Sequence, residues 1–336
     1  MKKMMVLLSL PLLGYGQQQQ PMGTRAGQFG YWIPETAAYR ARLNYRAEQV
    51  KRIEQSQERW DALMNLAMTG VLVKNFTKMG YEVVQTPANL HMALNETLHK
   101  ALRMGATRQE GKVDQISGPV AQFVNVGGVR SSVQYGMQPL MEAWAGVPLV
   151  STTAYGLRVY QPGNTLTMHT DRMETHVISC IVHVDRDLDE PWPIVIEGFD
   201  GRSVEVDLQP GQTLFYESAK CVHGRPRPMK GRWYTSLFVH YKPLDWNLRT
   251  NDARKVIEPY WQRFKAKPDK AKYHRLRLTG TGYYEPDCLH RWCHLSPDWP
   301  PKGNITPTDV SMLVAPDLIG LPTTSHNNNP EEDKEL

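Results

Sequence analysis

Three residues, His169, Asp171 and His223, have side chains of the type and spacing that bind a metal ion. His169 and Asp171 are two positions apart, after a predicted strand and a Pro-Gly turn. In an extended segment, side chains two positions apart point to the same face, so both can reach one ion. His223 follows several predicted strands later. Two imidazoles and one carboxylate occupy one face of an octahedral ion and leave three positions open, as in non-haem iron sites.

The His-x-Asp pair alone is a weak signal, because the chain has 11 histidines and contains a second such pair at His183 and Asp185. Its neighbours make the first pair more specific. Arg232 stands nine residues after His223, at the head of a predicted strand. A guanidinium there is suited to a bidentate bond with a carboxylate. Tyr160 stands nine residues before His169, and its hydroxyl would complete that carboxylate site.

With these residues in place, the chain from about residue 80 to 243 resembles the 2-oxoglutarate/iron(II) dioxygenase superfamily, specifically its prolyl 4-hydroxylase-like branch. The resemblance rests on Tyr160, His169-Thr170-Asp171, the segment 179–183, the turn 208–211, and the pair His223 and Arg232. It implies a mainly β fold with supporting helices, whose core is a double-stranded β-helix (jelly roll). We expect an α-helical region to precede that core.

The resemblance also implies a reaction. Iron(II) would be held by His169, Asp171 and His223, with 2-oxoglutarate and dioxygen as co-substrates and ascorbate as the reductant. Arg232 would bind the distal carboxylate of 2-oxoglutarate, with Tyr160 beside it. His183 stands where the family often has a tyrosine that contacts the co-substrate, and a packed core histidine is the alternative for this residue.

The expected substrate is a prolyl residue in a peptide or protein, hydroxylated with release of succinate and CO2. The sequence leaves two alternatives open, namely the same chemistry on a small molecule and a non-catalytic jelly-roll binding protein. Two departures from the family bear on the substrate: the segment 190–194 replaces a common Gly-Gly, and Arg232 stands where many prolyl 4-hydroxylases have lysine. Four aromatic residues near the site suit stacking on proline rings, although we expect at least half of them to fill the core: Tyr155, Trp192, Tyr216 and Trp233.

The elements that would position these residues are visible in the hydrophobic pattern. Leucines at four-residue spacing predict a helix over 89–104, and a third helix is expected over 135–145. From residue 147 onward, short β-rich runs alternate with Pro, Gly and Asp turns, which is typical of a sandwich or barrel. The predicted strands are 81–85, 157–160, 176–184, 194–196, 203–208, 213–216 and 234–241.

The N-terminal part has a different organisation. Two lysines, a ten-residue apolar run and a small-x-small sequence predict a signal peptide over 1–16, and hence a secretory address in the endoplasmic reticulum lumen or outside the cell. A flexible lead over 17–34 would follow. The region 35–79 would hold one long helix over 36–69, on which a homodimer could form.

The remaining composition is that of an ordinary globular chain. The formal charge of +5 is mild for 336 residues, so nucleic acid is not an expected partner, and no segment is long and apolar enough to span a membrane. Cys288 and Cys293 are expected to form a disulfide, whereas Cys180 and Cys221 are either buried thiols or a second disulfide. A C-terminal extension over 244–322 and a disordered tail over 323–336 complete the chain. The tail ends Asp-Lys-Glu-Leu, which is only partly like a retrieval signal.

Overall fold

The computed structural model describes residues 55–249 continuously, together with residues 39, 43, 46, 50, 51, 53, 251, 254, 258, 261, 282 and 283. Several expectations lie outside these residues: the signal peptide 1–16, the lead 17–34, the Cys288–Cys293 disulfide and the tail 323–336. Within the described part, no helix has both the length and the apolar character needed to cross a membrane.

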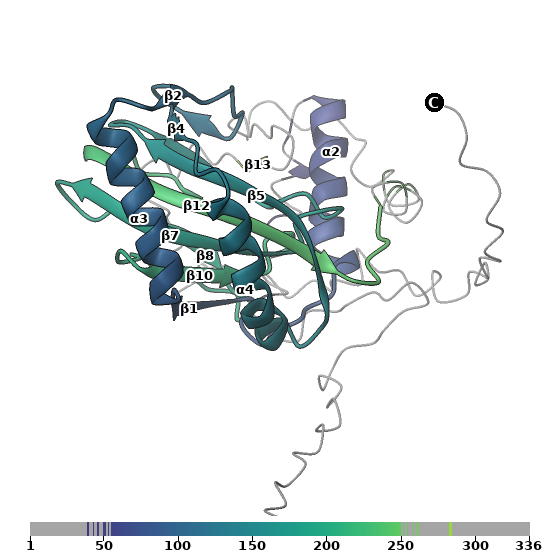
Figure 1. The fold of residues 1–336 in the computed structure, drawn as a ribbon. Coiled ribbons are helices and arrows are strands. Elements are labelled where there is room, and N and C mark those ends of the chain that lie inside the picture. Colours follow the sequence, from purple (N-terminus) through teal and green to yellow (C-terminus); the bar gives the residue numbers. More distant parts are fainter. Residues whose placement is uncertain are drawn as a thin grey trace, which may run out of the picture.

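Two antiparallel β-sheets form the body of the protein (Figure 1). The larger has seven strands in the order β1-β10-β7-β12-β5-β4-β2, and the smaller has the order β13-β6-β11-β8-β9, with β3 paired to β6. The strands before the central eight are β1 (Tyr81–Gln85), β2 (Arg108–Gln109), β3 (Ile116–Ser117) and β4 (Gln122–Val124). The central eight are β5 (Leu149–Tyr160), β6 (Thr165–His169), β7 (Ile178–Leu188), β8 (Ile194–Glu197), β9 (Ser203–Val206), β10 (Gln212–Tyr216), β11 (His223–Arg225) and β12 (Gly231–Pro243). The short strand β13 (Gly282–Tyr283) lies beyond them in the chain.

The order in which the chain visits the two sheets defines the fold. Strands β5, β7, β10 and β12 lie in the larger sheet, and β6, β8, β9 and β11 lie in the smaller one. The chain therefore crosses repeatedly between two facing sheets, which is the winding of a double-stranded β-helix. The predicted mainly β jelly-roll core is confirmed.

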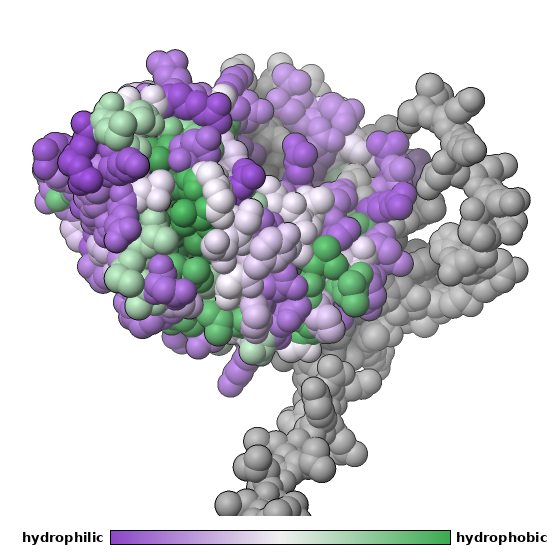
Figure 2. All heavy atoms as spheres, viewed as in Figure 1, coloured by the Kyte–Doolittle hydropathy of each residue, from purple (hydrophilic) through white to green (hydrophobic). Residues whose placement is uncertain are grey.

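Helices α3 (Ala88–Arg103) and α4 (Val129–Ala145) cover the outer face of the larger sheet (Figure 1). The expected leucine stripe is the buried face of α3, through Leu90, Leu94 and Leu98. These side chains share one core cluster with buried residues of β5, β7 and β12. Seen from the same side, hydrophobic surface shows between the two helices, and polar surface lies around it (Figure 2).

The predicted long helix over 36–69 is interrupted. Helix α2 spans Ser56–Ala67 and continues as a π-helix, η1, over Met68–Leu72. Gln55, before α2, has extended backbone angles, and Ile53 is not helical. The buried Arg59 side chain donates a 2.5 Å hydrogen bond to the carbonyl oxygen of Ile53, which takes up an acceptor that a continuous helix would have used internally.

Cys180 and Cys221 are buried free thiols. Burial raises the pKa of the Cys221 thiol well above its usual value, and the nearby Glu217 carboxylate adds to the effect. Neither cysteine is therefore suited to nucleophilic or metal-binding work. The sequence left open whether these two cysteines are buried thiols or form a disulfide, and the structure shows buried thiols.

The buried centre of β12 should carry much of the stability. Leu237 is fully buried in the cluster beneath α3 and α4. We expect Leu237→Ala to lower the free energy of unfolding by about 2–5 kcal/mol, measured by urea titration, because a cavity replaces the side chain. The matched control is Leu140→Ala on α4, where the leucine is 41% exposed and the change should stay within about 0.5 kcal/mol. Equal losses in the two variants would contradict this view of the core.

Candidate active site

The three predicted metal ligands meet at one end of the smaller sheet. His169 ends β6, His223 begins β11, and the two residues are direct partners in the antiparallel pairing of these strands. Asp171 lies in the loop that follows β6. Its Oδ1 is 3.7 Å from Nε2 of His169 and 4.0 Å from Nε2 of His223. One ligand atom from each residue lies within 4.8 Å of the other two, so a single ion can contact all three.

Backbone carbonyls set the orientation of both imidazoles. Nδ1 of His169 is 2.7 Å from the carbonyl oxygen of Thr167, and Nδ1 of His223 is 2.9 Å from that of Cys221. An Nδ1–H that donates to a carbonyl leaves the lone pair on Nε2, which is the usual arrangement of a metal-binding histidine. Burial lowers the pKa of each imidazole to about 4. Both rings are therefore neutral near pH 7, the form that binds metals.

Asp171 is held from several sides. Its backbone N–H donates to the carbonyl oxygen of Ser218 at 2.8 Å. Its Oδ2 lies 3.5 Å from the hydroxyl of Tyr216 and 3.7 Å from Nδ1 of His240. Burial raises the pKa of this carboxyl group in the protein without metal. A divalent cation beside Oδ1 would favour the carboxylate instead, so the donor set of two neutral imidazoles and one carboxylate fits iron(II).

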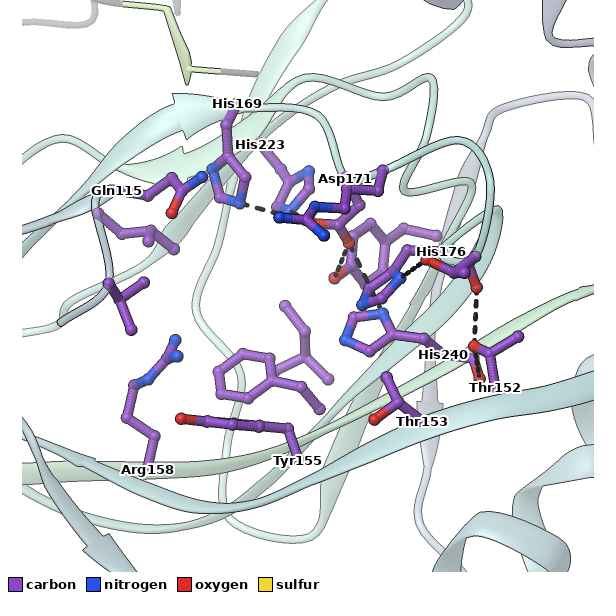
Figure 3. Close-up of a pocket in the computed structure, with 17 residues that line it drawn as sticks. Gln115, Thr152, Thr153, Tyr155, Arg158, His169, Asp171, His176, His223 and His240 are labelled. Carbon is purple, nitrogen blue, oxygen red and sulfur yellow. Dashed lines mark hydrogen bonds and ion pairs between the residues drawn. The ribbon is translucent and has the colours of Figure 1, made fainter. Parts of the chain in front are cut away.

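A cavity of about 580 Å³ opens beside the three ligands (Figure 3). This volume is in the range of small-molecule binding sites. Tyr155, Arg158, Ile181 and Phe238 line it along with the ligands, and Val113 and Gln115 contribute from the segment before β3. The metal-binding face is therefore accessible to a ligand of moderate size.

Arg158 is a cavity residue that the sequence analysis missed. Its Nε and Nη2 bond the two carboxylate oxygens of Glu110 at 2.8–3.0 Å, and Nη1 lies 3.2 Å from the hydroxyl of Tyr160. The Tyr155 hydroxyl donates to the same Glu110 carboxylate. Arg158 and Tyr160 alternate along the strand, and that spacing could have placed both on the inner face.

A second histidine pair, also missed, lines the cavity beyond Asp171. The rings of His176 and His240 are in contact, with their centroids 3.9 Å apart and their planes tilted by 38°. Nδ1 of His240 is 2.7 Å from Oγ of Ser179, and Nδ1 of His176 is 2.6 Å from Oγ1 of Thr175. Figure 3 shows His240 and His176 on the same side of the cavity as Asp171. They give this side of the cavity a polar, hydrogen-bonding character.

The structure does not bring Arg232 to the cavity. Its side chain is 80% exposed and forms an ion pair with Asp187. The pairing of β12 with β7 is irregular between Gly231 and Trp233, where β12 begins. This irregularity breaks the simple two-residue alternation that would have pointed Arg232 inward.

Tyr160 and His183 lie inside the jelly roll, deeper than the cavity wall. Tyr160 is buried and packs edge-on against Trp192, with ring centroids 5.0 Å apart. His183 is fully buried, and its ring stacks on Tyr234 at 4.2 Å. Its Nδ1 is 2.9 Å from the carbonyl oxygen of Thr235, while its Nε2 has no hydrogen-bond partner.

The four aromatic residues considered for proline stacking divide evenly. Tyr155 and Tyr216 line the cavity. Trp192 belongs to a buried cluster with Tyr160 and Tyr234, and Trp233 packs against the core beneath the helices. Half of them therefore fill the core.

No family model matches the chain, and no curated protein matches it. Solved structures do match. A Pseudomonas putida prolyl-4-hydroxylase is 17% identical with a TM-score of 0.40, over 49% of this chain and 93% of that one. A Trichoplax adhaerens prolyl hydroxylase, in complex with a hypoxia-inducible-factor peptide fragment, is 11% identical with a TM-score of 0.39, over 59% and 93%. HygX from Streptomyces hygroscopicus, with nickel, 2-oxoglutarate and hygromycin B bound, is 11% identical with a TM-score of 0.38, over 51% and 85%.

Likenesses at these identities and TM-scores carry no argument about what this chain binds or does, and its double-stranded β-helix is established by the strand order described above. The chain is thus similar in structure, at low identity, to two prolyl hydroxylases and to a protein crystallised with nickel, 2-oxoglutarate and hygromycin B.

Proposed function

We propose that this protein is an iron(II)- and 2-oxoglutarate-dependent dioxygenase that hydroxylates a prolyl residue in a peptide or protein. One observation carries the proposal: two neutral imidazoles and a carboxylate converge on one point at the edge of a cavity. Three ligands on one face leave open positions for a chelating co-substrate and for dioxygen. A purely structural metal site would be closed by a full set of protein ligands.

The chain's own residues orient and enclose the reactants. Carbonyl oxygens hold His169 and His223 in the tautomer that binds metal. The hydroxyl of Tyr216 donates a 3.5 Å hydrogen bond to the second oxygen of Asp171 and helps to keep that carboxylate in place. Bound iron(II) would supply the activation of dioxygen, and the oxidative decarboxylation of 2-oxoglutarate to succinate and CO2 would supply two electrons.

The cavity wall supports a prolyl substrate. Tyr155, Ile181 and Phe238 give it an apolar side, on which a pyrrolidine ring could pack. The same wall is continued by the Arg158–Glu110 ion pair, whose charges are already balanced. An uncharged ring therefore fits this side without leaving a charge unpaired.

A small polar molecule is the second candidate substrate, and the polar residues of the cavity favour it. They are Thr152, Thr153, Thr175, His176 and His240. Their hydroxyl and imidazole groups could bind the hydroxyls of a compact polar substrate. The substrate test below separates the two candidates.

The metal site is tested by removing one ligand at a time. His169→Ala and His223→Ala should each weaken Mn(II) binding by at least about tenfold, because loss of a residue that merely supports a metal ligand already has an effect of this size. Electron paramagnetic resonance measures the Mn(II) affinity. Both variants should also abolish 2-oxoglutarate turnover. The control is His99→Ala, because His99 lies on α3 and pairs with Asp185, outside the site. Undiminished metal affinity in either ligand variant would refute the assignment.

The substrate is tested with iron-loaded enzyme, 2-oxoglutarate, ascorbate and a panel of proline-rich peptides. We expect a mass increase of one oxygen atom on proline, in equal amount to the succinate formed. Asp171→Asn, which replaces a charged ligand by a neutral amide, is the inactive control. Succinate released only with small molecules would favour the second candidate. A protein that binds 2-oxoglutarate without turnover would instead be a non-catalytic relative.

We further propose that the protein enters the secretory pathway, where nascent prolyl substrates would meet it. The basis is the charged, apolar and small-residue pattern of residues 1–16. Mass spectrometry of the native protein should find an N-terminus at Gln17. Recovery of a peptide that still contains Lys2 and Lys3 would contradict this address.

A further inference from the structure

Arg225, the last residue of β11, is a buried cation that forms no ion pair within the described part of the chain. The residue is 3% exposed. Its Nη1 donates to the carbonyl oxygen of Trp192, and its Nη2 donates to the hydroxyl of Tyr234 at 2.8 Å. The guanidinium lies over both aromatic rings, 4.6 Å from the Trp192 centroid and 4.2 Å from that of Tyr234.

Two other arginines that are buried or half-buried have carboxylate partners. Arg158 pairs with Glu110, and Arg186 pairs with Asp207. The charge of Arg225 helps to lower the pKa of Asp207, but the Asp207 carboxylate is bonded to Arg186 instead. Because an isolated buried charge is costly, a buried guanidinium usually faces an anion. The environment of Arg225 is therefore incomplete without one.

Two further buried polar atoms near Arg225 have no hydrogen-bond partner. They are Oγ of Ser236 and Nε2 of His183, whose residues are 1% and 0% exposed. His183 stacks on Tyr234, and Ser236 lies two residues from Tyr234 along β12. Native proteins leave few such groups unsatisfied, and a bound ligand is one of the usual reasons. A carboxylate here could accept hydrogen bonds from Arg225, Tyr234 and Ser236.

The strand that carries Arg225 also carries a metal ligand. His223 and Arg225 are two positions apart on β11, and both side chains are buried inside the jelly roll. The pairing of β11 with β6 is irregular between these two residues, so their burial, and not strand alternation, places both side chains inside the fold. A five-carbon dicarboxylate bound to the metal by its keto-acid end would extend into this interior toward Arg225.

Phe238 forms the wall between the cavity and this buried group. It lines the cavity and also packs against the cluster of Tyr160, Trp192, Met229 and Tyr234. Its side chain is only partly buried. A ligand that contacts both the metal site and Arg225 would therefore have to displace this ring.

We propose that Arg225, instead of the exposed Arg232, binds the distal carboxylate of 2-oxoglutarate, with Tyr234 and Ser236 as additional donors. This inference rests on the proposed function and names the residue on which co-substrate selection depends. The residue that binds the distal carboxylate would then lie on β11, two residues after the metal ligand His223.

The test compares two ligands that differ only at the far end of the chain. 2-Oxovalerate has the same keto-acid group and chain length as 2-oxoglutarate, but a methyl group replaces the distal carboxylate. Calorimetry on the Ni(II)-loaded protein should show at least about tenfold tighter binding of 2-oxoglutarate, since a hydrogen bond to a charged group contributes about 1.5–3 kcal/mol. Arg225→Gln should abolish this preference and leave 2-oxovalerate binding unchanged.

Two variants serve as matched controls. Arg232→Gln should keep the full preference, because that side chain is exposed and pairs with Asp187. Arg225→Lys should keep part of it, because the charge remains while the planar fork is lost. If circular dichroism shows that Arg225→Gln is unfolded, Ser236→Ala decides: it should weaken binding of 2-oxoglutarate and leave that of 2-oxovalerate unchanged.

The outcomes separate this inference from the proposed function. A wild-type protein that binds 2-oxoglutarate preferentially, and an Arg225→Gln variant that keeps the preference, would overturn the anchor and leave the function standing. Loss of the preference in Arg232→Gln or Arg158→Gln alone would move the anchor to that residue. Absence of metal-dependent 2-oxoglutarate binding in the wild type would overturn both.

Discussion

The antiparallel pairing of β6 with β11 is the constraint on which the site depends. It sets His169 directly opposite His223, with both Nε2 atoms near Oδ1 of Asp171. A shift of one residue in this register would turn one imidazole to the other face of the sheet. The register is supported on both sides, because β11 also pairs with β8 and β6 also pairs with β3 and β13. The remaining strands hold these two short ones in place.

Burial sets the protonation states of the metal ligands, and it also costs folding free energy because polar groups are withdrawn from water. Withdrawal from water lowers the pKa of His169 and His223 to about 4 and raises that of Asp171. The two histidines therefore stay neutral and ready for a metal, but the carboxylate is disfavoured until a cation arrives. Hydrogen bonds from backbone and side chains compensate part of that cost. Tight packing around this polar centre holds the three ligands in one geometry.

Local sequence patterns predicted the parts of the fold that depend on local chemistry. The leucine spacing of α3 and the β-rich runs of β7, β10 and β12 read correctly, because each buries one regular face. Strands β6 and β11 were not predicted as such, since they are short and contain polar ligands. The prediction that Arg232 points into the site was wrong, because the pairing of β12 with β7 is irregular next to it. No residue pattern in the sequence indicates this irregularity. Arg158 and Arg225 were missed because only the tertiary fold shows that they are buried.

Charge balance links the metal site to the interior of the jelly roll. With neutral imidazoles, a divalent ion beside Asp171 would leave one net positive charge in a buried place. Arg225, on the same strand as His223, adds a second positive charge. Arg158 adds no net charge, because Glu110 neutralises it. A dicarboxylate brings two negative charges, one at each end of a short chain. It would neutralise both ends at once, whereas a monocarboxylate would leave one buried cation uncompensated. With a metal bound, this distribution of buried charge would therefore favour a dianion over a monoanion.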